Sequence, residues 1–500
     1  MERSQWGTRA GFILAAVGSA VGLGNIWRFP AVAYENGGGA FFIPYLFALL
    51  TAGIPILIME FTMGHKYRGS SPLTFRRINK KSEFVGWWGV LVAFVISTYY
   101  SVIIAWAISY SIFSVNLSWG SDTEGFLFNN YLELAEPGQF GSFVPSVLIP
   151  LIIVWLVVLG ILFRGVRKGI EMANRIFIPT LLVIFLIIVI RAVTLPGALT
   201  GLESFFQPDF SKIMEGEVWV AAYGQIFFSM SIAFAIMITY SSYLPKKSDI
   251  TNNAFITGFG NSSFELLAGI GVFSCLGFMA VQSGVAVDEV VADGVGLAFV
   301  VFPAIINEFP VLSELFGFLF FASLVLAGLT SLMSICETYI AGLVDKFKIS
   351  RQKAVIFGGG LAALVSLIYA TQGGMNFLDA VDYFINQFGV AMLGLVEVVL
   401  IAWVFRKLSD FKSHADAVSD IRLGWWWKVS LGLITPLVLG YMMYDLFKLN
   451  FTENYGGYSD AFILWSGWAV AIGALVVGII MSLTKWNTNQ KDDEEIKEAN

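Results

Sequence analysis

The sequence predicts an all-α membrane protein with twelve transmembrane helices. Of its 500 residues, 57% are hydrophobic and only 13% are charged, and apolar runs of about 20 residues, long enough to cross a bilayer, recur along almost the whole chain. Two of these runs, the first and the sixth, are interrupted in the middle. The expected spans are residues 10–36, 39–64, 84–115, 143–163, 170–195, 218–243, 254–282, 311–343, 354–370, 376–405, 429–448 and 461–483.

The distribution of lysine and arginine predicts which loops face the cytoplasm. The loops after spans 2, 4, 6, 8 and 10 all carry basic residues, whereas residues 116–142 and 283–310 carry none. Because cytoplasmic loops are enriched in basic residues, both termini are expected in the cytoplasm of a protein of the cell membrane. Residues 1–9 would then be a cytoplasmic segment, residues 196–217 an extracellular loop and residues 484–500 a cytoplasmic tail.

The first span begins like a membrane helix and is then interrupted. Three of the seven residues from Gly18 to Gly24 are glycine, and Asn25, Arg28 and Pro30 follow. Glycine and proline weaken a helix, and an arginine in a membrane segment normally faces a partner or an aqueous cavity. The glycines alone would suit a helix-packing face. Together with Asn25 and Arg28 they favour a site for a small ion and a polar solute.

The sixth span contains a second interruption. Its centre, Phe228–Phe234, carries two serines in an apolar run, which alone is weak evidence, because serines often bond within membrane helices. The first span opens the first five helices and the sixth opens the next five. Interruptions in corresponding places of two halves are typical of secondary transporters with a binding site between inverted repeats.

Three segments carry a family resemblance. Gly18–Pro30 (GSAVGLGNIWRFP), Gly224–Ser231 (GQIFFSMS) and Ala327–Ser331 (AGLTS) resemble helices 1, 6 and 8 of the neurotransmitter:sodium symporters, with consistent spacing over ten spans. Short outer loops make the chain similar to prokaryotic members. The resemblance implies a leucine-transporter-like fold, with inverted five-helix repeats at 10–195 and 218–405 and helices 11 and 12 at 429–483.

The resemblance also implies two sodium sites at the broken helices. Both would consist of neutral oxygen ligands, which suit a hard cation that must leave again. Taken alone, the hydroxyls of Thr330 and Ser331 would suit helix-to-helix hydrogen bonds. The first site would use Ala20, Asn25, Ser229 and Asn261, and the second Gly18, Val21, Ala327, Thr330 and Ser331.

The implied substrate is a neutral, hydrophobic L-amino acid. Monoamine-carrying relatives have an aspartate at the position of Gly22, whereas glycine leaves room for the carboxylate of an amino acid beside the first sodium. Tyr100 would donate its hydroxyl to that carboxylate. The implied pocket comprises Ala20, Gly22, Gly24, Ile96, Tyr100, Phe228, Ser229, Ser231, Ala233, Phe234, Ser331 and Ile335.

Gates are implied on both sides of the pocket. The outer gate would be Arg28 with Asp382, beside Gln225 and under Phe234. The inner gate would comprise Arg3, Trp6, Tyr243 and Asp345, although Arg3 also fits an ordinary basic residue near the cytoplasm.

Two further features bear on transport. Glu265 lies one turn beyond Asn261, where chloride-dependent relatives have serine, so its carboxylate would replace chloride and could carry a proton on the return. Gly169 and Pro179 have the spacing that lets the inner half of helix 5 unwind in the family, although proline alone predicts only a kink.

The sequence therefore predicts a sodium-coupled amino acid symporter that works by alternating access and is not an enzyme, since no nucleophile–base or metal-ligand cluster is visible. The expected partners are the amino acid, sodium ions and the lipid bilayer, not nucleic acid. An ion channel or a substrate sensor built on the same fold are the alternatives.

Overall fold

The computed structural model describes residues 4–487, and within these bounds every regular element is a helix. Ten helices there are long and apolar enough to cross a membrane, and the bent pair α1 and α2–α3 makes eleven. The remaining predicted span, the sixth, corresponds to α12 and α13, which have 14 and 6 residues and are each too short to cross alone. The twelve predicted spans are thus all present as helices.

The first half of the chain contains α1 (Arg9–Ala20), α2 (Leu23–Trp27), α3 (Phe29–Glu35), α4 (Phe42–Ala48), α5 (Ile54–Tyr67), α6 (Ser71–Ile78), α7 (Glu83–Phe113), α8 (Thr123–Gly125), α9 (Pro145–Phe163), α10 (Met172–Val193) and α11 (Ala198–Phe206). The second half contains α12 (Gly216–Ser229), α13 (Ile236–Ser241), α14 (Ile250–Ser283), α15 (Gly294–Gly296), α16 (Phe302–Asn307), α17 (Ser313–Phe347), α18 (Arg351–Ala354), α19 (Gly360–Ser366), α20 (Gly374–Phe384), α21 (Met392–Val399), α22 (Leu408–Val418), α23 (Trp425–Val429), α24 (Thr435–Thr452), α25 (Asp460–Ile463) and α26 (Ala469–Leu483).

Nine stretches of the described chain are π-helical, and all but Phe126–Tyr131 and Leu400–Val404, which end their helices, continue into an α-helix. These stretches are Leu49–Gly53, Phe126–Tyr131, Val166–Glu171, Leu297–Val301, Val355–Gly359, Ile385–Ala391, Leu400–Val404, Ser430–Ile434 and Leu464–Trp468. Single turns of 3₁₀-helix occupy Gly39–Phe41, Lys80–Ser82, Lys212–Met214, Val287–Glu289, Leu367–Ala370 and Tyr455–Gly457.

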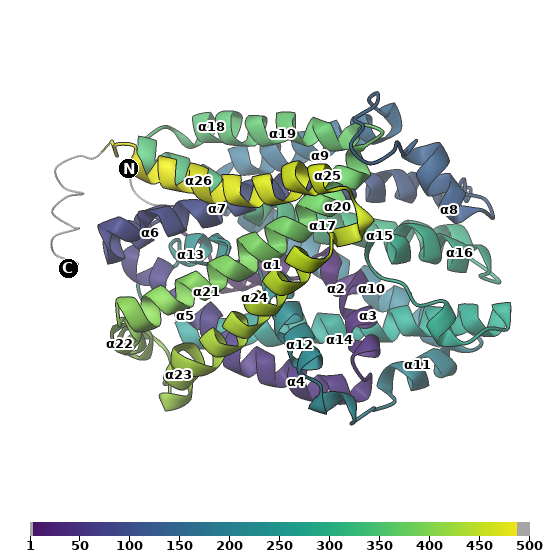
Figure 1. Cartoon of the computed structure of the whole chain (residues 1–500), viewed down its shortest axis with the longest axis horizontal. Helices are drawn as coiled ribbons and strands as arrows, with labels where there is room; N and C mark the ends of the chain where they lie inside the picture. The colour runs from purple at the N-terminus through teal and green to yellow at the C-terminus, as the bar shows by residue number, and fades with distance from the viewer. Residues whose placement is uncertain (1–3, 488–500) are drawn as a thin grey trace.

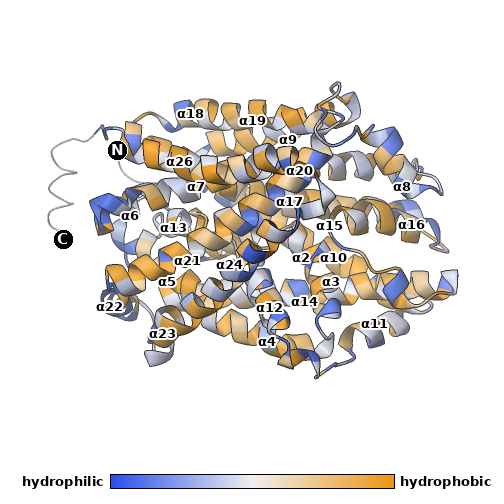
Figure 2. Ribbon diagram, in the orientation of Figure 1, coloured by the Kyte–Doolittle hydropathy of each residue, from blue (hydrophilic) through white to orange (hydrophobic). Residues whose placement is uncertain are grey.

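The long helices run along the long axis of the molecule (Figure 1), with α6 and α22 at one end and α8, α11 and α16 toward the other. Apolar residues cover the middle of the helices, whereas hydrophilic residues gather at α6, at α22 and in loops at the opposite end (Figure 2). This pattern fits a bundle whose middle lies in lipid and whose two ends meet water.

The helices differ in how much of each is buried. In α7 and α14, 72% of the apolar window lies inside the protein, against 33% in α9 and 28% in the span that contains α10. Leu156 of α9 and Ile190 of α10 are more than 60% exposed. Such exposed apolar faces fit contact with lipid, so α9 and α10 lie at the periphery and α7 and α14 near the centre.

Both predicted interruptions are real breaks. Helix α1 ends at Ala20, Val21 and Gly22 are extended, and α2 begins at Leu23. Between α12 and α13, Ser231, Ala233 and Ala235 have φ values of 52°, 66° and 70°. A non-glycine residue in this left-handed region costs of order 1 kcal/mol or more, so the second break persists only because its surroundings hold it.

Candidate transport site

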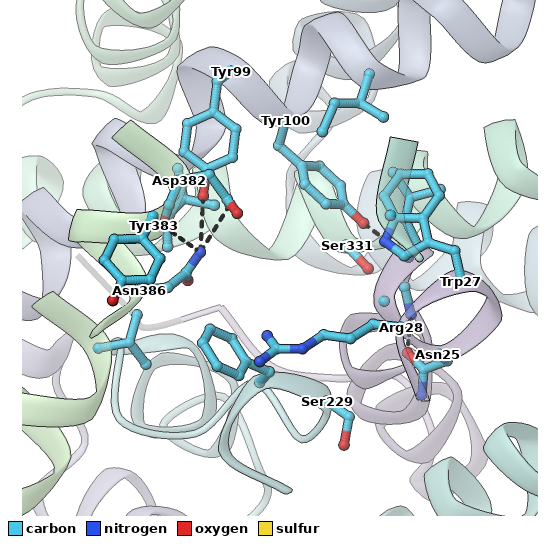
Figure 3. A pocket seen from close by; sticks show the side chains of 18 of the residues that line it. Asn25, Trp27, Arg28, Tyr99, Tyr100, Ser229, Ser331, Asp382, Tyr383 and Asn386 are labelled. Atoms are coloured by element: carbon cyan, nitrogen blue, oxygen red, sulfur yellow. Dashed lines mark hydrogen bonds between the residues drawn. The ribbon is translucent and has the colours of Figure 1, made fainter. Parts of the chain in front are cut away.

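A cavity of about 590 Å³ lies between the two breaks. It extends from Ser19 and Ser331 past Arg28 to Asp293 and Tyr455. Most of the predicted substrate and outer-gate residues line it (Figure 3). They are Ala20, Gly22, Gly24, Arg28, Ile96, Tyr100, Gln225, Phe228, Ser229, Ser231, Phe234, Ser331, Ile335 and Asp382.

Ala233 is the one predicted pocket residue that does not line the cavity. Its backbone N–H donates to Glu60 Oε1 at 2.6 Å. The neighbouring Ser231 hydroxyl donates to the Ser19 carbonyl at 2.7 Å, which joins the two breaks directly. The open segment between α12 and α13 is therefore anchored both to α5 and to the end of α1.

The structure brings the four residues of the first predicted sodium site together. The Asn25 amide donates to Asn261 Oδ1 at 2.8 Å, and the Asn261 amide donates to the Ser229 hydroxyl at 3.1 Å. Asn261 Oδ1 also faces the carbonyl oxygens of Ala20 and Ser229 at 3.2 and 3.3 Å. Oxygens facing one another without a shared proton repel unless a cation lies among them or the amide turns round.

Two residues of the second predicted site, Gly18 and Ser331, meet where α1 packs on α17. The Ser331 hydroxyl lies 3.4 Å from the Gly18 carbonyl and 3.2 Å from that of Ser19. The Thr330 hydroxyl donates to the Ala327 carbonyl at 2.9 Å. Both hydroxyl residues are buried. Because this donor set also consists of neutral oxygens, it fits a hard monovalent cation.

Gly22 lines the cavity at a point where two hydroxyl groups lie close to it. A methyl group there would lie 3.0 Å from the Tyr100 hydroxyl and 3.1 Å from Ser331 Oγ. The Tyr100 hydroxyl already accepts a bond from the Leu23 N–H at 3.3 Å. The hydroxyl hydrogen of Tyr100 therefore remains for an acceptor, while Ile96, Phe228, Phe234 and Ile335 supply apolar walls to the cavity.

The predicted outer gate is apart in this structure. Arg28 places its guanidinium carbon 3.8 Å from the centre of the Phe228 ring, a cation–π contact. Asp382 instead accepts from the Asn386 amide at 2.8 Å (Figure 3). Within the described residues no ion pair joins Arg28 and Asp382, and the cavity continues between them.

The opposite side of the cavity is packed. Trp6 is buried, and its backbone and indole N–H groups donate to the carbonyls of Tyr243 and Tyr240 at 3.1 and 2.8 Å. Asp345 accepts from the Ser70 N–H at 2.7 Å. The structure thus brings Trp6 and Tyr243 together, whereas Arg3 lies outside the described residues.

Glu265 is fully buried beside the first predicted sodium site. Its Oε1 accepts from the Gln225 amide at 2.6 Å. The Tyr45 hydroxyl bonds to its other oxygen and lies 2.8 Å from the Ser262 hydroxyl. A carboxylate surrounded by an amide and hydroxyl groups occupies a place where a bound anion would also be well solvated.

The fifth span, called helix 5 below, is helical throughout Val166–Val193 in this structure. Gly169 belongs to the π-helical stretch Val166–Glu171, and Pro179 lies inside α10. Asn174, one turn after Ile170, is buried, and its Oδ1 has no hydrogen-bond partner among the described residues. This oxygen lies beside Gly18 of the second predicted site.

Sequence reasoning missed three side chains that lie beside the site: Tyr45, Glu60 and Asn174. Glu60 carried a usable signal, because it is the one acid in the apolar run 39–64 and such residues are usually functional. Tyr45 and Asn174 carried none, since tyrosine and asparagine occur in many membrane helices without a specific role.

Comparison with known proteins shows the family to which this chain belongs. Residues 3–139 and 120–489 match the model of the sodium:neurotransmitter symporter family. The sodium-dependent transporter MJ1319 of Methanocaldococcus jannaschii is 41% identical over 97% of this chain and 98% of its own. The sodium-dependent dopamine transporter of Caenorhabditis elegans is 30% identical, covering 96% of this chain and 85% of its own.

A solved structure is also similar. The crystal structure of MhsT in complex with L-phenylalanine superimposes with a TM-score of 0.76 at 32% identity, covering 89% of this chain and all of that one. Two broken helices around a cavity in a multi-pass bundle define a secondary transporter. The chain belongs to the sodium:neurotransmitter symporter family and has the leucine-transporter-like fold.

Proposed function

We propose that this protein carries out sodium-coupled symport of neutral, hydrophobic L-amino acids by alternating access. The observation that carries the proposal is the position of Gly22, which lines the cavity beside the Tyr100 hydroxyl and close to the Asn25–Asn261 oxygen cluster. A substrate carboxylate placed there would accept from Tyr100 and complete the coordination of a cation. The similar structure of MhsT holds an amino acid with a large apolar side chain.

Coupling follows from charge. A cation and a carboxylate each cost much less to desolvate when the other is present. If the first sodium and the substrate share the cluster, each raises the affinity for the other by the same factor. Ile96, Phe228, Phe234 and Ile335 would surround the apolar side chain of the amino acid, which favours leucine-sized or aromatic substrates over polar ones.

Alternating access would use the two gate regions in turn. The separated pair Arg28 and Asp382 and the packed Trp6 support an outward-facing state. After substrate binds, Arg28 would leave the Phe228 ring and join Asp382, and Phe234 would cover the substrate. Opening at the Trp6 side would then release the solutes into the cytoplasm, given the proposed orientation with both termini inside.

Glu265 would make transport independent of chloride. Two sodium ions and a zwitterionic amino acid bring a net positive charge into a water-excluded site, which a nearby ionised carboxylate partly offsets. When sodium and substrate have left, the buried carboxylate would take up a proton and return outward in the neutral form. Proton counter-transport would follow.

Binding of radiolabelled amino acids to the purified full-length protein tests the proposal. We expect saturable binding of one or more neutral, hydrophobic L-amino acids in sodium chloride and equally in sodium gluconate, and none in potassium chloride. Absence of sodium-dependent binding across a panel of neutral amino acids would contradict the proposed substrate class. The amount of amino acid retained in potassium chloride measures its nonspecific partition into detergent and is subtracted as the control.

A further inference from the structure

The buried side chain of Glu171 and the partly exposed Arg175 join the N-terminal segment to helix 5, the span formed by Val166–Glu171 and α10. The Gly7 N–H donates to Glu171 Oε2 at 2.6 Å, and the Thr8 hydroxyl donates to Oε1 at 3.1 Å. Arg175, one turn along, donates to Oε1 at 2.8 Å. Glu171 is 2% exposed, so these contacts compensate a carboxylate that water reaches poorly.

The start of helix 1 is shaped around this carboxylate. A methyl group on Gly11 would overlap the Glu171 carboxyl group, and one on Gly7 would lie 3.2 Å from both of its oxygens. Thr8 is the N-cap of α1 and accepts from the Gly11 N–H at 3.0 Å. The same hydroxyl therefore caps α1 and contacts helix 5, so loss of Glu171 would also disturb the cap.

Glu171 lies at the point of helix 5 that is least regular. It is the last residue of the π-helical stretch that contains Gly169, and the α-helix follows at Met172. A π-helical turn has weaker geometry than an α-helix and often lies at a functional position. The contact to the N-terminal segment thus falls on the turn where unwinding of helix 5 would begin.

The N-terminal segment also closes the inner side of the site. Trp6, next to Gly7, bonds to the carbonyls of Tyr240 and Tyr243 at the end of α13. Eleven residues after Gly7, Gly18 of α1 lies against Asn174 of helix 5. Glu171 therefore links the segment that carries Trp6 to helix 5, and helix 5 in turn lies against Gly18 of the second predicted sodium site.

We propose that Glu171 is a positioning residue that couples the N-terminal segment to helix 5, so that Trp6 releases and helix 5 unwinds in one step. The proposal rests on the proposed transport function and deepens it. Without this coupling, either element could open while the other stayed closed, which would let sodium leak through the second site. With it, both segments share a single two-state equilibrium.

Hydrogen–deuterium exchange on the purified full-length protein tests the coupling without any amino acid present. In the wild type, replacing sodium by potassium should lower protection of residues 7–12 and 166–175 by the same factor. Glu171→Gln keeps the size of the side chain but removes its charge. We expect residues 7–12 to lose roughly tenfold in protection in this variant and helix 5 to stop following the cation.

Two further variants make the outcome specific. Gly11→Ala leaves Glu171 intact but displaces it, and should reproduce the effect of Glu171→Gln. Glu203→Gln, an exposed acid on α11, is the matched control and should exchange like the wild type. Trp6→Ala approaches the coupling from the other side and should lower protection of residues 166–175.

The coupling is wrong if Trp6→Ala leaves residues 166–175 as protected as in the wild type. It is also wrong if the two segments respond to sodium by different factors in the wild type. Because the measurement needs only sodium and potassium, it can fail while amino acid binding is normal. Conversely, a chain that binds no amino acid could still show coupled exchange, so the two proposals fail independently.

Discussion

Gly22 is the residue that most restricts the substrate. It lines the cavity, and a methyl group in place of its hydrogen would crowd the hydroxyls of Tyr100 and Ser331. Gly24, two residues further, has no atom within 4 Å of the place where a methyl group would go. Substitutions at these two glycines should therefore affect substrate binding differently, although both residues lie in the same break.

We expect Gly22→Asp to abolish amino acid binding, because its carboxylate would occupy the substrate carboxylate's place and repel it. The loss should exceed about a hundredfold, since an unpaired second negative charge in a closed site costs several kcal/mol. Gly24→Ala is the matched control and should change affinity by less than a few fold. Competition binding measures both, and retained affinity in Gly22→Asp would contradict the carboxylate's placement.

Asn25 and Ser229 should affect sodium and substrate together. We expect Asn25→Ala and Ser229→Ala each to weaken amino acid binding roughly tenfold or more, with a matching rise in the sodium concentration needed for half-saturation. Titrating sodium at several substrate concentrations gives both values. If the sodium dependence stayed as in the wild type while substrate affinity fell, the two ligands would not share this cluster.

Glu265 predicts a switch in anion dependence. Glu265→Ser should bind and transport poorly in gluconate and recover when chloride is added, because the pocket then lacks its fixed negative charge. Glu265→Gln is the control, since its amide fills the space that chloride needs and should prevent recovery. Equal activity of the serine variant with and without chloride would remove this role from Glu265.

At the scale of elements, the two breaks and their placement in the chain were predictable, because glycine, proline and polar residues interrupt apolar runs only rarely. The sequence placed the second break at 228–234, and the open segment runs over residues 230–235. The π-helical stretches were not predictable, since an apolar run has the same composition in either helix type. The contact of Glu171 with Gly7 depends on packing between distant segments, which periodicity does not report.

Helix α22 is held to the end of α5 by the only two histidines of the chain. His65 Nε2 lies 2.9 Å from the Pro245 carbonyl and His65 Nδ1 lies 2.9 Å from His414 Nε2. Because the carbonyl can only accept, Nε2 of His65 carries the hydrogen, and His414 must donate to Nδ1. This arrangement needs a neutral His65, and a doubly protonated pair would place two N–H groups against each other.

Burial, together with the neighbouring His65, Lys66 and Arg68, lowers the pKa of His414 to about 4, with Asp410 opposing. A pKa lowered by folding favours the neutral ring in the folded protein. The resulting stabilisation is complete above the unfolded pKa of about 6.5 and is lost as the pH falls from there toward 4.

We therefore expect the thermal midpoint to fall between pH 7 and pH 5 by more in the wild type than in His414→Gln. The glutamine variant keeps a donor for His65 Nδ1 but cannot titrate. Tryptophan fluorescence during heating measures both midpoints. Identical pH dependence in the two proteins would show that His414 contributes nothing to it.

At the scale of the whole molecule, membership of the family and the multi-pass fold agree with the predicted twelve spans. Two expectations stay predictions. They are the cytoplasmic position of both termini and the division of the chain at residues 10–195, 196–217, 218–405 and 429–483. The cavity reaches Asp293 and Tyr455 on one side, and Trp6 is buried on the other. An ion channel would need a continuous aqueous path through the bundle, whereas a substrate sensor would bind the amino acid without releasing it on the Trp6 side.

Uptake into proteoliposomes tests the central claim most directly. Reconstituted protein with an inward sodium gradient should accumulate a labelled hydrophobic L-amino acid above its outside concentration, in chloride-free buffer, with saturation. A sodium ionophore should abolish the accumulation, and an outward proton gradient should speed it. Sodium-dependent binding with no accumulation, or a sodium flux that neither saturates with nor requires amino acid, would contradict sodium-coupled symport.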